Sequence, residues 1–158
     1  LDFEAMRDGM LQVSGELNLT MHGPSQKLHS KPYSKRRAVY GYIDRQNISP
    51  TLNSFDFANP NIHAPQRVET TVPQQALFAF NHPFVIDRSA TLAKKAFEST
   101  TANPSSQVEF LYRQILSRDP NKEETGLGME FLGQEPKLEN LEDLAQTLLV
   151  SNEFFFTD

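Results

Sequence analysis

Apolar residues recur three and four positions apart at the start of the chain. Residues at these spacings are neighbours on a helical surface, so the pattern predicts an amphipathic helix over residues 2–19. Gly23-Pro24 follows and predicts a sharp stop to any helical continuation. The apolar positions of the predicted helix are Phe3, Met6, Met10, Val13 and Leu17.

Residues 25–65 are mostly polar and lack this periodicity, which predicts long loops. Residues 38–43 are the exception, because a short aromatic and β-branched run is typical of a strand. The best partner for this strand is a weaker candidate at residues 68–72. Ser49-Pro50 predicts an N-cap and the first residue of a short helical turn that ends near Phe55.

Helical signals return at residue 71. Thr71-Val72-Pro73-Gln74 matches a capping box, in which the Gln74 side chain would bond back to the cap residue. Asn81-His82-Pro83 predicts the end of that helix and the start of the next. Three further helices are expected, with starts at Ser106, at Asp119-Pro120 and at Asn140.

These patterns together predict a mainly α fold. We expect an irregular helical bundle with a minor short β element and long polar loops. Residues 1–103 would form an N-terminal helical region that holds the β element, and residues 104–158 a C-terminal helical subdomain. The two would pack as one continuous unit.

The composition of the chain excludes several kinds of functional site. The chain has 158 residues and no cysteine, which excludes disulfides, a thiol nucleophile and thiolate zinc sites. No two of its four histidines have the i, i+4 spacing of a zinc helix, so we predict no metal and no cofactor. No apolar run approaches the roughly 20 residues that span a bilayer. The chain does not begin with Met, and we expect it to be a piece of a longer protein.

Charge is distributed unevenly. The formal net charge is -5, yet a short stretch without acids is basic. Such a stretch could bind phosphate backbones, or it could be a solvated loop. The acidic chain as a whole and the lack of interleaved aromatics favour the loop, so no nucleic-acid partner is expected. The basic residues are Lys27, Lys31, Lys35, Arg36 and Arg37.

The densest collection of polar side chains lies around the predicted helix starts between residues 56 and 81. They could line a polar pocket in which an arginine grips a carboxylate or sulfate and the amides bind sugar hydroxyls. Alternatively, they are helix caps, and Arg67 forms a structural ion pair with Asp56 or Glu69. We favour this scaffold role because caps explain most of the residues. No catalytic residue is predicted. The candidate ligand-binding residues are Asp56, Arg67, Thr70, Gln74, Gln75 and Asn81.

Several short sequence motifs, taken in their order along the chain, resemble the planctomycete-specific domain of unknown function (the PSD domain). That domain lies at the C-terminus of multidomain planctomycete cytochrome-type proteins. The motifs are Ala5-Met6-Arg7-Asp8, Val13-Ser14-Gly15-Glu16-Leu17, Arg36-Arg37-Ala38-Val39-Tyr40, Phe55-Asp56, Arg67, Thr71-Val72-Pro73-Gln74-Gln75-Ala76-Leu77, Asn81-His82-Pro83-Phe84-Val85, Leu144-Ala145-Gln146-Thr147-Leu148-Leu149 and Ser151-Asn152-Glu153-Phe154. The resemblance implies an exported parent, with an extracytoplasmic (periplasmic or envelope-associated) location. It carries no known activity, and the haem motif of the cytochrome-type parents is absent here.

A second, local resemblance covers residues 111–120 together with residues 151–154. These look like the start and end of small helical domains found in exported bacterial proteins, which are regarded as structural or connecting. Ser117 stands where those domains usually have glycine. Within this segment Arg118 is expected to form a buried ion pair or to bond helix C-terminal carbonyls.

The leading functional hypothesis is a non-catalytic C-terminal structural or interaction module of a larger exported multidomain protein of unknown activity. Its partners would be the upstream domains of the parent, with a polysaccharide or other anionic small ligand as a further option. The alternative is a part of an enzyme or carbohydrate-binding site formed with the upstream domain, to which Asp56 and Arg67 would contribute.

Overall fold

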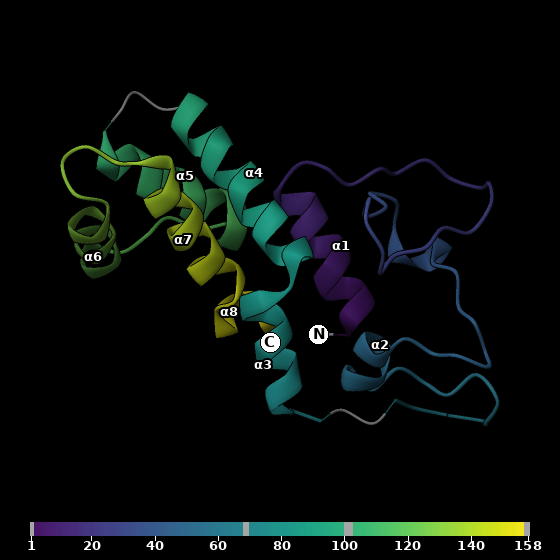
Figure 1. Cartoon of the computed structure of the whole chain (residues 1–158). Helices are drawn as coiled ribbons and strands as arrows, with labels where there is room; N and C mark the ends of the chain where they lie inside the picture. The colour runs from purple at the N-terminus through teal and green to yellow at the C-terminus, as the bar shows by residue number, and fades with distance from the viewer. Residues whose placement is uncertain (1, 68–69, 100–102, 157–158) are drawn as a thin grey trace. The chain divides into compact units, whose positions relative to one another are not determined.

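The structure, a computed structural model, describes residues 2–67, 70–99 and 103–156, and these ranges contain eight α-helices and one short 3-10 helix (Figure 1). The predicted mainly α fold is confirmed. The chain divides into two compact units, Leu1–Ala79 and Phe80–Asp158. The sequence-based division at residue 103 placed the segment 80–103 in the first region, whereas here it belongs to the second unit.

The first unit is built on helix α1 (Phe3–Val13). Phe3, Met6 and Met10 are buried along one face, as their spacing predicts. The helix ends six residues earlier than expected because Gly15 adopts a positive φ of 69°. The N–H groups of the two residues after Gly15 then both donate to the carbonyl of Leu11 and turn the chain away from the helix axis.

The predicted strand at residues 38–43 is wrong. Ala38–Tyr40 forms the 3-10 helix η1, and the Ala38 N–H, which a ladder would need, donates to the Asp8 carboxylate at 2.9 Å. In the described ranges, β pairing occurs only as isolated bridges, Asn18 with Arg36 and Gln26 with Gly41. The expected partner segment includes residues 68 and 69, which lie outside the described residues.

Two further helices follow, and the boundary between the units falls near the end of the second. Helix α2 (Pro50–Ser54) begins after Ser49, as predicted. Helix α3 (Pro73–Asn81) begins at Pro73, so Thr71 lies two residues before it and the predicted capping box is wrong. Its end was predicted correctly.

Four helices of the second unit form its core. Helix α4 (Pro83–Ser99) packs most extensively on α7 (Leu138–Leu149), and α5 (Pro104–Leu116) contacts α4, α7 and α6 (Lys122–Leu132). The short helix α8 (Asn152–Phe155) contacts α5 and α7. Fully buried side chains on the facing surfaces include Val85, Leu92, Val108, Leu111, Leu141 and Leu149.

The predicted starts of three of these helices are wrong by two to three residues. Asn103 caps α5 by accepting from the Ser105 N–H at 3.1 Å, with Pro104 in the first turn. Asn121, and not Asp119, caps α6, where it forms a capping box with Glu124. Helix α7 begins after Lys137 rather than at Asn140. In each case an alternative polar residue stood close by, and spacing alone did not choose between them.

Candidate functional site

Three of the six candidate residues form one hydrogen-bonded chain in the first unit. Asp56, just after α2, accepts from the Thr70 N–H at 2.7 Å and from the Thr70 hydroxyl at 2.7 Å. The Gln75 side-chain amide donates to the carbonyls of Thr70 and Ser54, both at 3.0 Å. This series of hydrogen bonds connects the end of α2 to the first turn of α3. Asp56 has a positive φ of 54°, a conformation that Asp tolerates better than most residues.

Arg67 lies in a separate cluster. Its guanidinium donates to both carboxylate oxygens of Glu4, at 2.7 and 3.0 Å, and lies 3.4 Å from an Asp2 oxygen. It also lies over the Phe57 ring, 5.0 Å from the centroid. The partner expected from sequence, Asp56, is instead bonded to Thr70, and Glu69 lies outside the described residues.

The ion pair changes the titration of Glu4. Burial is the largest single influence and raises the pKa of this carboxyl group, but the hydrogen bonds from Arg67, a backbone hydrogen bond and the charge of Arg67 together outweigh it and hold the pKa below its ordinary value. Glu4 is therefore a carboxylate at neutral pH, and Arg67 neutralises it. A bidentate arginine–carboxylate pair is a fixed, directional contact.

The other two candidates lie apart from these contacts. Gln74 is exposed in the first turn of α3, and Asn81 is the last residue of α3 and belongs to the second unit. The candidate residues of the first unit thus form a hydrogen-bonded chain and an ion-pair cluster that hold segments of the fold together.

Two buried arginines of the first unit were not among the candidates. Arg7, 1% exposed, donates to the Arg36 carbonyl at 2.9 Å, to the Ser34 carbonyl and to Asp8. Arg36, 8% exposed, donates to the carbonyls of Pro24, Thr20 and His22. Its guanidinium lies 4.0 Å from the centroid of the Tyr40 ring. These two side chains satisfy loop carbonyls that no regular structure pairs.

The same contacts divide the basic stretch. Arg36 is buried, and Lys35 pairs with Glu16 at 2.7 Å. Lys31 lies 5.9 Å from the centroid of the Tyr33 ring. The basic residues between Lys27 and Arg37 therefore do not form a continuous basic stripe on the surface.

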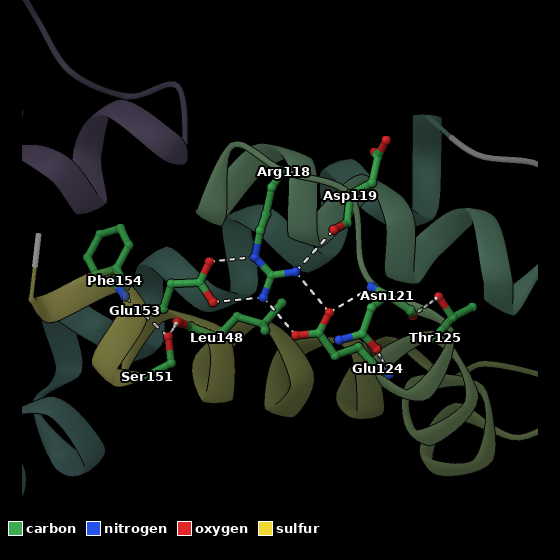
Figure 2. Close-up of polar contacts among 9 residues, drawn as sticks. All are labelled: Arg118, Asp119, Asn121, Glu124, Thr125, Leu148, Ser151, Glu153 and Phe154. Atoms are coloured by element: carbon green, nitrogen blue, oxygen red, sulfur yellow. Dashed lines mark hydrogen bonds and ion pairs between the residues drawn. The ribbon is translucent and has the colours of Figure 1, made fainter. Parts of the chain in front are cut away.

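The second unit has a polar centre at Arg118 (Figure 2). Its guanidinium donates to both oxygens of Glu124, at 2.7 and 2.8 Å, and to both oxygens of Glu153, at 2.5 and 2.7 Å. It lies 5.3 Å from the centroid of the Tyr112 ring. The expected ion pair exists, but it is not buried, since the Arg118 side chain is 37% exposed, and the neighbouring Asp119 pairs with Arg113 instead.

Both acids of this centre titrate abnormally. The hydrogen bonds from Arg118, followed by that from the Asn121 N–H, lower the pKa of Glu124 to about 2. The hydrogen bonds from Arg118 also lower the pKa of Glu153. The centre joins the end of α5, the cap of α6 and the start of α8. We call the three residues Arg118, Glu124 and Glu153 the arginine clasp.

Comparison with known families decides the classification. The model of the PSD1 family, described as a protein of unknown function (DUF1553), matches residues 1–132. This chain belongs to the PSD1 family. No curated protein and no solved structure matches it.

The geometry explains several sequence motifs that carried the resemblance to the PSD family. Arg7 and Asp8 of one motif bond the backbone of Arg36 and Ala38 in another, at 2.9 Å each. The two segments of the second resemblance, 111–120 and 151–154, also meet, through the arginine clasp. In this PSD1 chain, motifs that are distant in sequence therefore contact one another.

Within residues 2–67, 70–99 and 103–156 of this PSD1 chain, no group of three or more His, Asp and Glu side chains is arranged to hold a metal ion. None of the helices in the same ranges is long and apolar enough to cross a membrane.

Proposed function

We propose that this PSD1 chain is a non-catalytic structural and interaction module of a larger exported multidomain protein, in which it packs on the upstream domains. The observation that carries the proposal is the pairing of Arg67 with Glu4 and Asp2, together with that of Asp56 with Thr70. A ligand site would need these charges to be available. They are engaged in holding the chain together.

The surface of α6 supports the interaction role. Leu127 and Phe131, one helical turn apart, are 62% and 51% exposed, and Met129 is 41% exposed. Gly128 and Leu132, which follow Leu127 and Phe131 on a neighbouring face of the helix, are buried. A helix that exposes large apolar side chains in this way is typical of a surface that another protein covers. The occupant we propose is an upstream domain of the parent.

The exported, multidomain setting is supported by resemblance. The segments 111–120 and 151–154 are similar to those of helical domains in exported bacterial proteins, and the PSD-like motifs imply a long parent. An extracytoplasmic location belongs to the proposal on the same ground.

The proposal is tested by mixing this chain with the remainder of its parent, each produced as a separate polypeptide, and measuring association by calorimetry. We expect a complex that the double substitution Leu127→Ser and Phe131→Ser weakens by tenfold or more, roughly the effect of losing an apolar anchor. Ile62→Ser is the matched control, because Ile62 is 67% exposed in the other unit. No association, or equal effects of both variants, contradicts the proposal.

The enzyme alternative is separated by Arg67→Ala in the full-length parent. The alternative expects any polysaccharide turnover by the parent to disappear while the unfolding temperature of the rest of the protein is unchanged. The module hypothesis expects turnover to persist and the first unit to lose stability, because Glu4 and Asp2 lose their partner.

A further inference from the structure

A cavity of about 450 Å³ lies in the first unit, between α1, η1 and the segment after α2. Its volume is within the roughly 300–1,000 Å³ that small-molecule sites occupy. The walls are mostly apolar and include Phe3, Leu28, Ala38, Leu52 and Phe57. We call this the α1–η1 cavity.

Three charged residues line the cavity: Glu4, Asp8 and Arg37. The two acids already have partners. Glu4 accepts two hydrogen bonds from Arg67, and Asp8 accepts from the Ala38 N–H and from Arg7. Each carboxylate is therefore neutralised by a guanidinium of its own.

Arg37 differs from the two acids. It is exposed at the cavity wall, and within the described part of the chain its guanidinium makes no hydrogen bond or ion pair. Its backbone is fixed, because the Arg37 carbonyl accepts from the Tyr40 N–H at 3.0 Å at the start of η1. The charge that the cavity offers to a ligand is thus the single positive charge of Arg37.

We propose that the α1–η1 cavity binds a small organic carboxylate with an apolar body. The carboxylate would receive two parallel hydrogen bonds from Arg37, and the apolar body would lie against Phe3, Leu28 and Leu52. A cationic ligand is disfavoured, because it would have to displace Arg67 from Glu4. This inference goes beyond the proposed function, and its test is independent of the test of that function.

The test is an amide-resolved NMR titration of the whole chain with three matched probes: 4-phenylbutyrate, the neutral 4-phenylbutyramide and the cationic 4-phenylbutylamine. We expect 4-phenylbutyrate to shift the amides of Ala38, Gly41 and Leu52 saturably, with a Kd on the order of 1 mM, as is usual for so small a ligand. The amide should bind about tenfold more weakly, because it lacks the charge-assisted pair with Arg37. The amine should bind no better than the amide.

Three variants complete the test. Arg37→Gln should lower the affinity for 4-phenylbutyrate to that for the amide, while Arg45→Gln, an exposed arginine of the same unit outside the cavity lining, should leave it unchanged. Ala5→Trp, at an exposed position that lines the cavity, should fill it and abolish binding of 4-phenylbutyrate and of 4-phenylbutyramide. The proposal is overturned if no probe binds, if amine or amide binds as well as the carboxylate, if Arg45→Gln matches Arg37→Gln, or if Ala5→Trp has no effect.

Discussion

Arg118 and Glu153 are 35 positions apart in the chain, yet their side chains meet in two parallel hydrogen bonds of 2.5 and 2.7 Å (Figure 2). The same guanidinium holds Glu124 in the same way. One side chain therefore joins the end of α5 to the cap of α6 and to α8, the last helix of the second unit.

Removing the clasp arginine should destabilise the second unit. We expect Arg118→Met to lower the free energy of unfolding by about 1 kcal/mol, at the upper end for a partly exposed pair because the arrangement is bidentate and shared by two acids. Urea unfolding of the whole chain measures it. Arg113→Met is the control: the side chains of Arg113 and its partner Asp119 are 62% and 66% exposed, and no measurable change is expected. Equal effects of the two variants would show that the arginine clasp adds no more to the free energy of unfolding than an exposed ion pair does.

The clasp also predicts a response to acid. The ordinary pKa of Glu124 is 4.5, and in the folded chain it is lowered to about 2. A group whose folded pKa is depressed stabilises the fold above its ordinary pKa and loses that contribution as the pH falls through the folded value. Stability from this group should therefore be complete above about pH 4.5 and disappear towards about pH 2.

Glu124→Gln isolates that contribution, because Gln can still accept from the Asn121 N–H in the capping box but does not titrate. Thermal unfolding across this pH range should show a shallower acid-induced fall in Tm for Glu124→Gln than for the unsubstituted chain. High salt should reduce the difference, since the pair is partly exposed. A parallel fall in both proteins would mean that other carboxylates control acid unfolding.

Periodicity and chain breakers predicted much of the fold. The apolar face of α1 and the α3–α4 junction at Asn81-His82-Pro83 follow from local sequence, because a helix is stabilised by neighbours within one turn. The predicted strand failed for a nonlocal reason. Ala38–Tyr40 has strand-like residues, but Asp8, thirty positions earlier, takes the N–H that a strand would pair.

The candidate site shows the same limit. Asp56, Thr70 and Gln75 were identified as polar residues near helix ends, and they do bond one another, but through contacts other than the predicted caps. The partner of Arg67 was not predictable, because Glu4 is 63 positions away and no motif links the two. The buried Arg7 and Arg36 were missed as structural residues, since nothing in composition distinguishes a buried arginine from a solvated one.

Close packing of α6 on α5 gives a sharper prediction. A Cβ atom added at Gly128 would lie 2.7 Å from Val108 Cγ2, whereas one at Gly126, in the same helix, would meet nothing within 4 Å. We expect Gly128→Ala to destabilise the chain by about 1–3 kcal/mol through overpacking, and Gly126→Ala to stabilise it by about 0.5–1 kcal/mol through helix propensity. Urea unfolding of both variants tests the pair. A stabilising Gly128→Ala would mean that α6 does not pack on Val108 as described.

Gln107 lies in α5 and has no exposed surface. Neither polar atom of its side chain has a hydrogen-bond partner within the described ranges. A buried amide without a partner has lost its hydration without compensation, so an apolar replacement of similar shape should be favourable. We expect Gln107→Met to stabilise the chain by about 1 kcal/mol and to raise Tm in a thermal scan.

The matched control for Gln107 is Gln146→Met in α7. The Gln146 side chain donates to the Phe80 carbonyl at 2.7 Å, and its replacement removes a hydrogen bond that exists. This variant should be neutral or destabilising by up to about 1 kcal/mol. The two substitutions should therefore change stability in opposite directions. If Gln107→Met destabilised the chain as much as Gln146→Met does, the Gln107 amide would have to be hydrogen-bonded in solution.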